Sequence, residues 1–426
     1  ECIESTPLEV KSIGRYSDLA YDPTRGIGWV SAYVEDFGDL AVGRVGEENN
    51  ITWYWVDGVP NDAPVVAAPS GPRGGVSEPG DDVGQYTSLT IGEDGAIHIA
   101  YFDVTHRALK YALGIANTDG TINWVITTLD QGGRLDGEPD QRTDEEGAGW
   151  WTDIVLDQLG RPNVIYRSLQ QDTQDMPTLT SSVRWLKSGN VHPSTVEDWS
   201  TPQVLHITTP PESLISLGYP EGTALFNTLA KTPTGLAAAW YDRSAGNMMS
   251  AQLTTEQFSP AEVIPGWEHK TLKGDYGANV DLNVDDNGAL HFCYQDGSTD
   301  SLRYLSPDLD RDEWVDDGIR LTVDGREHAL HVVGDDCNLS FDEQGRVFIV
   351  YQDATGHELL IARRDASGSW LRVTVRGPSL GESQSSSGFF AAGVSLGEMV
   401  LISHYLYDHQ VDPPRQFLEV LKVPTP

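Results

Sequence analysis

The stretch GQYTSLTIGEDGAIHIAYFD, residues 84–103, decides the fold because the chain writes it more than once. The stretch GANVDLNVDDNGALHFCYQD, residues 277–296, can be laid over it without a gap. Both contain a glycine, a short alternating run, a turn with Gly, and a second alternating run that ends in Tyr-x-Asp. Period-two alternation on either side of a turn is the pattern of a β-hairpin, so each copy predicts two antiparallel strands.

The phrase recurs along the whole chain of 426 residues. With the first two stretches, the copies start near residues 14, 84, 149, 224, 277, 334 and 387. They lie about 50 to 75 residues apart, as blade-sized repeats with loop insertions do. Further short strands follow most copies, often entered through a Trp, as in residues 122–130, 313–323 and 369–377.

Four strands in each of seven units is the arithmetic of a β-propeller. The sequence therefore predicts an all-β fold: one seven-bladed propeller of four-stranded antiparallel blades over residues 1–426. A ring of blades buries both faces of every sheet and leaves only short edges. We expect residues 7–13 to close the ring by pairing, in the last blade, with the strand at residues 417–423.

The composition limits the partners. The chain has 28 Lys and Arg against 64 Asp and Glu, a net charge of −36 at pH 7, which excludes nucleic acid because phosphate is repelled. Solubility and a specific cation-binding role both account for this acidity. No apolar run approaches the roughly 18 residues of a membrane span. We expect an extracellular, cell-surface or periplasmic bacterial protein, with any signal or anchoring segment absent from this chain.

The three cysteines are Cys2, Cys293 and Cys337. They have no CxxC spacing, so they predict no metal cluster. Cys293 and Cys337 stand in neighbouring copies of the phrase, which makes a disulfide between them one alternative. Three free thiols are another, and the sequence leaves the pairing open.

Two turns that precede a Trp carry a family resemblance. NTDGTINW (residues 117–124) and the shorter DASGSW (residues 365–370) resemble the Asp-box, Ser-x-Asp-x-Gly-x-x-Trp, of the BNR/sialidase-like bacterial β-propeller repeats. The resemblance extends over nearly the whole chain as architecture, and it implies a fold rather than a function. In that family the Asp-box is a structural turn. The three arginines of sialidases have no counterpart in a common register here, so we predict no catalytic residue.

The mouth of the predicted channel is the candidate ligand site. The starts of the first strands and the ends of the second strands should meet on one face of a propeller. The residues predicted to bind ligand there are Tyr16, Tyr86, Trp151, Phe226, Asp103, Asp242, Asp296 and Asp353, with Asp336 in the same register as the aromatic residues. Aromatic rings beside carboxylates suit a sugar or a cationic ligand. The alternative is that each Tyr-x-Asp carboxylate accepts backbone N–H bonds in its own turn.

Calcium is the one cofactor that the sequence suggests. Asp18, Asp153 and Asp281 occupy equivalent inner-strand positions, and carboxylates that converge in a channel repel one another unless a cation or water lies between them. The alternative is a water-filled channel. Asp308, Asp310 and Asp312 open like a calcium loop, but Glu313 and Ile319 stand where that loop needs Gly and Glu, so an acidic hairpin is the competing interpretation.

Together these features predict a binding propeller that recognises a glycan, a protein or a cationic ligand at the channel mouth. One alternative is a glycoside hydrolase or lyase that uses carboxylates at the mouth. Another is a structural spacer module. Whether the protein is an enzyme is not decided by the sequence, although the lack of a motif such as GxSxG or HExxH favours a binding role.

Overall fold

The computed structural model describes residues 12–58, 79–132, 146–172, 178–209, 222–253, 257–264, 276–307, 309, 311–321, 328–381, 385–409 and 415–426. These residues form β-strands joined by turns, with the short 3₁₀ helices η1 (Glu47–Asn49), η4 (Val196–Asp198) and η5 (Pro378–Leu380). Within them, no helix has the length and apolar character needed to cross a membrane.

Four-stranded antiparallel sheets are the repeating unit, as predicted. Along the chain they consist of β5 (Val83–Ile91), β6 (Ile97–Asp103), β7 (Ala108–Ala116) and β8 (Ile122–Asp130); β9 (Gly147–Leu156), β10 (Pro162–Asp172), β11 (Thr178–Lys187) and β12 (Gln203–Thr208); β13 (Leu225–Thr232), β14 (Gly235–Asp242), β15 (Asn247–Leu253) and β16 (Glu262–Val263); β17 (Tyr276–Val284), β18 (Leu290–Asp296), β19 (Ser301–Leu305) and β20 (Glu313–Asp316); β23 (Val333–Phe341), β24 (Val347–Asp353), β25 (Glu358–Arg364) and β26 (Trp370–Arg376).

A seven-stranded sheet contains both ends of the described chain. Its strands, in order, are β27 (Ser385–Leu396), β28 (Met399–Asp408), β29 (Arg415–Pro424), β1 (Ser12–Asp22), β2 (Ile27–Val34), β3 (Asp39–Val45) and β4 (Ile51–Asp57). Ser12 and Ile13 of β1 pair in parallel with Gln416 and Phe417 of β29. The other residues of the predicted closing strand, 7–11, lie outside the described residues.

Within the predicted strand at residues 313–323, the described part, 313–321, is not a single strand. β20 ends at Asp316, and a separate hairpin of β21 (Ile319–Leu321) and β22 (His328–Leu330) follows. Asp316 Oδ1 accepts the Gly318 backbone N–H at 3.0 Å, and Gly318 has a φ of 69°. The turn that this bond and this left-handed glycine close breaks the strand.

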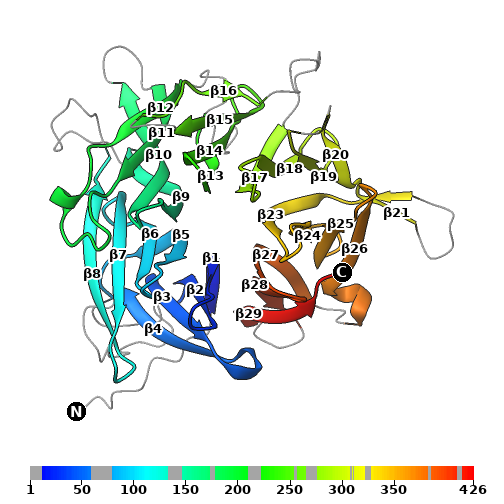
Figure 1. The fold of residues 1–426 in the computed structure, drawn as a ribbon, viewed down its shortest axis with the longest axis horizontal. Helices are drawn as coiled ribbons and strands as arrows, with labels where there is room; N and C mark the ends of the chain where they lie inside the picture. Colours follow the sequence, from blue (N-terminus) through cyan, green and yellow to red (C-terminus); the bar gives the residue numbers. More distant parts are fainter. Residues whose placement is uncertain are drawn as a thin grey trace.

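The sheets stand around a central opening, with β1, β5, β9, β13, β17, β23 and β27 nearest to it (Figure 1). Apolar side chains hold each sheet against the next. For example, Val42 of β3 and Leu89 of β5 belong to one buried cluster, while Leu401 of β28 and Val30 of β2 belong to another. Burying each such side chain stabilises the fold by about 1.5–3 kcal/mol. This radial arrangement of antiparallel sheets is that of a β-propeller.

The glycine that begins each full copy of the phrase has a packing role. Gly84 has a φ of 103°, and a Cβ there would lie 2.9 Å from the Leu40 Cα of the preceding sheet. At Gly149, with a φ of 113°, a Cβ would lie 2.9 Å from the Leu109 Cα. At these two positions the missing Cβ lets the inner strand approach the third strand of the preceding sheet closely.

Candidate functional site

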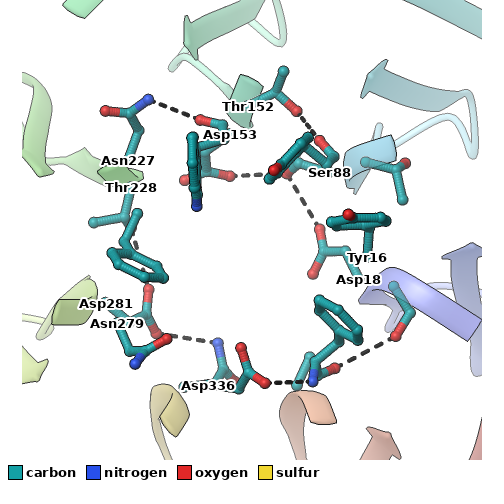
Figure 2. A pocket seen from close by; sticks show the side chains of 18 of the residues that line it. Tyr16, Asp18, Ser88, Thr152, Asp153, Asn227, Thr228, Asn279, Asp281 and Asp336 are labelled. Carbon is teal, nitrogen blue, oxygen red and sulfur yellow. Dashed lines mark hydrogen bonds between the residues drawn. The ribbon is translucent and has the colours of Figure 1, made fainter. Parts of the chain in front are cut away.

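A cavity of about 450 Å³ lies at the centre of the ring, between the inner strands (Figure 2). Each inner strand contributes three consecutive residues to its wall. These are residues 16–18, 86–88, 151–153, 226–228, 279–281, 336–338 and 390–392. The wall is therefore built from three rows, one for each position in the triplet.

The first row begins each triplet with a left-handed residue in a β-bulge. In β5, Gln85 pairs with Phe102 and Ser88 with Ala100, so one extra residue stands on the inner strand. The φ angles of the row are 55° at Tyr16, 51° at Tyr86, 46° at Trp151, 53° at Phe226, 51° at Asn279, 49° at Asp336 and 51° at Phe390. The bulge directs this row's side chains toward the cavity.

Five neighbouring members of this row are aromatic. Ring centroids are 5.2 Å apart for Phe390 and Tyr16, and 4.6 Å for Tyr16 and Tyr86. The series continues at 4.8 Å from Tyr86 to Trp151 and at 6.1 Å from Trp151 to Phe226. We call these five residues the aromatic arc. All five side chains are half-buried, so the arc gives the cavity one continuous apolar wall.

The remaining two members, Asn279 and Asp336, form the polar side of the cavity (Figure 2). Asn and Asp are the residues that tolerate a left-handed backbone best after glycine. A bulky residue in this conformation costs about 1–2 kcal/mol. The backbone therefore favours Asn279 and Asp336, whereas the aromatic residues occupy the same conformation at a cost in stability. The aromatic residues are therefore favoured at these positions by the cavity that they line and not by their backbone conformation.

The second row supports the first. The Asn227 side chain donates from Nδ2 to the Trp151 carbonyl at 2.8 Å, and Ser17 donates to the Phe390 carbonyl at 3.4 Å. Thr152 likewise donates to the Tyr86 carbonyl. Each bond runs from one inner strand to the left-handed residue of the preceding one. The positions of the arc residues are thus fixed by their neighbours before any ligand arrives.

The third row contains the carboxylates that were predicted to line the channel. Asp18 accepts the backbone N–H of Leu19 and that of Leu89 on the next inner strand, both at 2.7 Å. Ser88 Oγ lies 3.2 Å from an Asp18 oxygen and 2.9 Å from an Asp153 oxygen, so its single proton can be donated to either carboxylate. These bonds join β1, β5 and β9.

Asp153 and Asp281 repeat the arrangement. Asp153 accepts the backbone N–H of Leu229 on β13 at 2.5 Å. Asp281 accepts from Leu339 N–H at 2.7 Å and from Thr228 Oγ1 at 3.1 Å. Each carboxylate therefore joins adjacent sheets, which is a structural role.

The structure does not gather these carboxylates into a metal site. Among the described residues, the group of His, Cys, Asp or Glu side chains whose ligand atoms come within 4.8 Å of one another is Asp81, Asp103 and His106. Lys110 lies 3.6 Å from Asp103 there, and its positive charge competes with an ion. Asp18, Asp153 and Asp281 are not in a group of this kind within the part of the chain that the structure describes, and cation binding by these three stays a prediction.

Burial shifts the acidity of the channel carboxyls. Loss of solvent, with a smaller contribution from the charge of Asp153, raises the pKa of Asp18 and of Asp281 to about 7. Burial also raises the pKa of Asp153. On the polar side, burial and then the neighbouring charge of Asp335 raise the pKa of Asp336 to about 6. The cavity is therefore less negative at neutral pH than its residue content implies.

The Tyr-x-Asp carboxylates lie outside the cavity wall. Asp103, Asp242, Asp296 and Asp353 are all buried. Each accepts a backbone N–H in the turn that follows, from His106 at 2.8 Å, Ala245 at 3.3 Å, Ser298 at 3.1 Å and Gly356 at 2.6 Å respectively. The structure thus separates the predicted ligand residues: the four aromatic ones meet at the cavity, and the four aspartates close turns.

The predicted calcium loop is described only in part. Asp308 and Asp310 lie outside the described residues. Asp312 accepts the Tyr294 hydroxyl at 2.8 Å and lies 3.7 Å from the Arg303 guanidinium. This carboxylate therefore has partners within its own sheet.

The sequence alone did not identify Phe390 and Asn279 as members of the cavity wall. Phe390 lies in a copy of the phrase, SGFFAAGVSL, that has lost most of its pattern. Asn279 is neither aromatic nor acidic, so it does not share the residue type that marks the other members of the row. Counting two residues from the repeated glycine to the left-handed position finds both.

A disulfide links Cys293 of β18 to Cys337 of β23, with Cα atoms 6.5 Å apart. Cys337 lies in the cavity wall between Asp336 and Asn338. This bond resolves the pairing that the sequence left open, and it fastens two neighbouring sheets on the polar side of the cavity.

The Asp-box-like turns are closed by their aspartates. Asp119 Oδ1 accepts the Thr121 N–H at 3.0 Å, and Asp365 Oδ1 accepts the Ser369 N–H at 2.9 Å. Both turns lie between the third and fourth strands of their sheets. Their role is structural, as the resemblance implied.

No protein-family model and no curated protein sequence matches the chain. Among solved structures, puromycin hydrolase aligns with a TM-score of 0.51 and 13% identity, over 100% of this chain and 54% of that one. This chain thus spans about half the length of that enzyme. An α-L-arabinanase of Penicillium chrysogenum complexed with arabinobiose gives a TM-score of 0.48 and 11% identity, over 79% of this chain and 92% of that one. The polysaccharide lyase Uly1 gives 0.43 and 12%, over 93% and 88%. The likeness at these identities concerns the propeller fold alone.

Proposed function

We propose that this protein is a seven-bladed β-propeller that binds a carbohydrate in the mouth of its central channel. In this interpretation the seven-stranded sheet comprises two blades, β27–β29 and β1–β4, joined edge to edge where β1 pairs with β29. The five four-stranded sheets are the other blades. The buried cluster that joins Leu401 to Val30 supports this closure.

The observation that carries the proposal is the aromatic arc opposite Asn279 and Asp336. Sugar rings present apolar C–H faces that pack on aromatic rings, and their hydroxyls need donors and acceptors. The arc supplies the first, and the amide and carboxyl of the polar side supply the second. The cavity volume of about 450 Å³ is within the range of small-ligand sites.

Binding is a better account of the cavity than hydrolysis or elimination. The Oδ atoms of Asp18, Asp153 and Asp281 accept hydrogen bonds from two sheets each, so moving a proton to a substrate would loosen the ring. Asp336 accepts the Phe390 N–H at 2.8 Å through one oxygen, which leaves the other to bind a hydroxyl. A pair such as Asp103 and Asp153 is not offered to one substrate, because Asp103 closes a turn outside the cavity wall.

The disulfide supports a location outside the cytosol. Disulfides persist in oxidising compartments and are rare where glutathione keeps thiols reduced. We therefore place the protein outside the cell, on the cell surface or in the periplasm.

A glycan array tests the proposal. The purified chain is applied to immobilised neutral and acidic oligosaccharides, with calcium and with a chelator, and the affinity of the best binder is measured by calorimetry. Trp151→Ala and Tyr86→Ala should each weaken binding by about tenfold or more, since each removes part of the arc. Trp55→Ala is the matched control, because Trp55 is 37% exposed on β4 and does not line the cavity.

The array also separates the alternatives. Equal affinity in the Trp151 and Trp55 variants would contradict a site at the arc. Failure of every oligosaccharide would remove the carbohydrate and leave a protein or cationic ligand, or a spacer role. Release of a modified sugar during the incubation would instead support the enzymatic alternative.

A further inference from the structure

We propose a second binding site, for a small carboxylate with an apolar ring body, in a pocket of about 350 Å³ between the β1–β4 strands and the β5–β8 sheet. This inference does not depend on the carbohydrate proposal. β1 runs from Tyr16 in the channel wall to Asp22 in the pocket wall, so the two sites lie toward opposite ends of the same strand.

The charge of the pocket comes from Arg44 of β3. Its side chain is exposed in the pocket wall, and within the described part of the chain it makes no ion pair or hydrogen bond. Tyr54 on β4 lines the same pocket, and its hydroxyl also has no partner among the described residues. A guanidinium and a phenol that line one pocket can together bind the oxygens of a carboxylate.

The other titratable residues of the pocket already have partners within it. Arg25 pairs with Asp22 at 2.8 Å, and His192 pairs with Asp94 at 2.7 Å. Arg44 is therefore the cation that remains for a ligand. In a chain with a net charge of −36, the general field repels anions, so an arginine left without a carboxylate is chemically specific.

The apolar part of the pocket would hold the ring of the ligand. Trp29 is the cross-strand partner of Arg44, and its ring lies 6.3 Å from that of Tyr54. Ile115 and Ile122, from the neighbouring sheet, complete the apolar lining. Aromatic and branched side chains on both sides leave a slot for a flat, apolar group.

The pocket is held open by contacts between the two sheets. The Arg25 guanidinium donates to the backbone carbonyl of Asp94 and lies against Gly95, where an added Cβ would displace it. The spacing between the walls is therefore set in the absence of a ligand. A preformed site avoids the ordering cost that a flexible one incurs on binding.

The test compares 2-naphthoate with its neutral analogue 2-naphthamide on the full chain, by saturation-transfer NMR and calorimetry. We expect one 2-naphthoate molecule per chain and binding of 2-naphthamide that is about tenfold weaker, because a charge-assisted hydrogen bond is lost. Arg44→Gln should weaken 2-naphthoate by about tenfold and leave 2-naphthamide unchanged. Arg311→Gln is the matched control, because Arg311 is exposed and lies outside the pocket.

Two results would overturn the proposal. One is equal affinity for the acid and the amide in the unmodified chain. The other is 2-naphthoate binding that Trp151→Ala abolishes and Arg44→Gln does not change, which would place the compound in the channel. Thermal unfolding of each variant checks folding, and Tyr54→Phe, which removes only the hydroxyl, gives a second reading of the carboxylate contact.

Discussion

Asp281 of β17 accepts the backbone N–H of Leu339 on β23 through Oδ2 at 2.7 Å, and Thr228 of β13 donates to its Oδ1 at 3.1 Å. One carboxylate therefore joins three sheets. Leu282 N–H and the Asn338 amide also donate to it, at 2.9 and 3.1 Å. All of these partners are donors, so the ionised form of Asp281, which prevails above its raised pKa of about 7, accepts from each of them.

At pH 8, where Asp281 is ionised, Asp281→Asn should lower the free energy of unfolding by about 1–3 kcal/mol, because the new amide places its own donor against Leu339 or Asn338. Chemical denaturation measures the loss. Asp286→Asn, an exposed aspartate in the following turn, is the control and should change stability by less than about 0.5 kcal/mol. Equal losses in the two variants would contradict the joining role.

The raised pKa of Asp18 predicts a pH dependence of stability. The folded chain keeps this proton up to about pH 7, whereas the unfolded chain releases it near its ordinary value, so the stabilisation is complete at low pH and is lost as pH rises toward 7. Between pH 5 and 8, the wild type should lose about 1 kcal/mol more than Asp18→Asn, after allowance for the solvent in the channel. Parallel pH profiles of the unfolding midpoint would contradict this assignment.

The disulfide between Cys293 and Cys337 should stabilise the folded chain. It closes a segment with a sequence separation of 44, and removing it should cost about 2–4 kcal/mol of unfolding free energy. Cys337→Ser and treatment with a reductant should give matching losses by thermal or chemical denaturation. Cys2→Ser serves as the control, since it leaves this pair intact, and a loss of the same size there would refute the assignment.

Gly84 and Gly345 separate packing from backbone conformation. Both have a positive φ, 103° and 72°, but a Cβ at Gly84 would press on Leu40, whereas a Cβ at Gly345 meets nothing within 4 Å. Gly345→Ala should cost about 1 kcal/mol through the backbone alone. Gly84→Ala should cost about 2–4 kcal/mol, since overpacking is added. Similar midpoints in urea for the two variants would show that the close approach to Leu40 is unimportant.

Asp103→Ala distinguishes the turn role of the Tyr-x-Asp aspartates from a ligand role. The variant loses the hydrogen bond from the His106 N–H, and Lys110 loses one of its carboxylate partners. The free energy of unfolding should therefore fall by about 1–3 kcal/mol. Affinity for the best glycan should stay within about twofold of wild type. Loss of binding in a variant that unfolds like the wild type would return Asp103 to the ligand site.

The four-stranded sheets could be predicted because their signals are local. The alternation and the turn glycines lie within a repeated phrase of about twenty residues, so the hairpin predicted from one copy can be checked against the other copies. The β21–β22 hairpin was missed because its strands are only three residues each, too short for a period to show. Asp316 and Gly318, which make the turn between β20 and β21, looked like the middle of a longer strand.

The sequence predicts which residues occupy equivalent positions in the repeats, but it does not predict the direction in which their side chains point. Tyr86 and Trp151 follow the repeated glycines at a fixed interval, so their shared position could be inferred. The aspartates, such as Asp353, follow at an equally fixed interval, but whether a strand's last side chain turns toward the axis or into its own loop depends on how the sheet packs. The aromatic arc also depends on the bulge, which is a property of strand pairing that no single copy of the phrase reveals.

The third row of the channel wall has an odd number of positions. Asp18, Ser88, Asp153, Thr228, Asp281 and Asn338 alternate acceptor and donor from strand to strand, and an odd number of inner strands prevents the alternation from returning to its start. Ala392 of β27 occupies the leftover position, and among the described residues no side-chain bond of this row crosses from β27 to β1. The ring of side-chain hydrogen bonds is therefore interrupted between β27 and β1, in the sheet where the two ends of the described chain pair. Under a pulling force on the two chain ends, the ring should open first between β27 and β1. The side-chain hydrogen bonds of the third row should hold the other inner strands together.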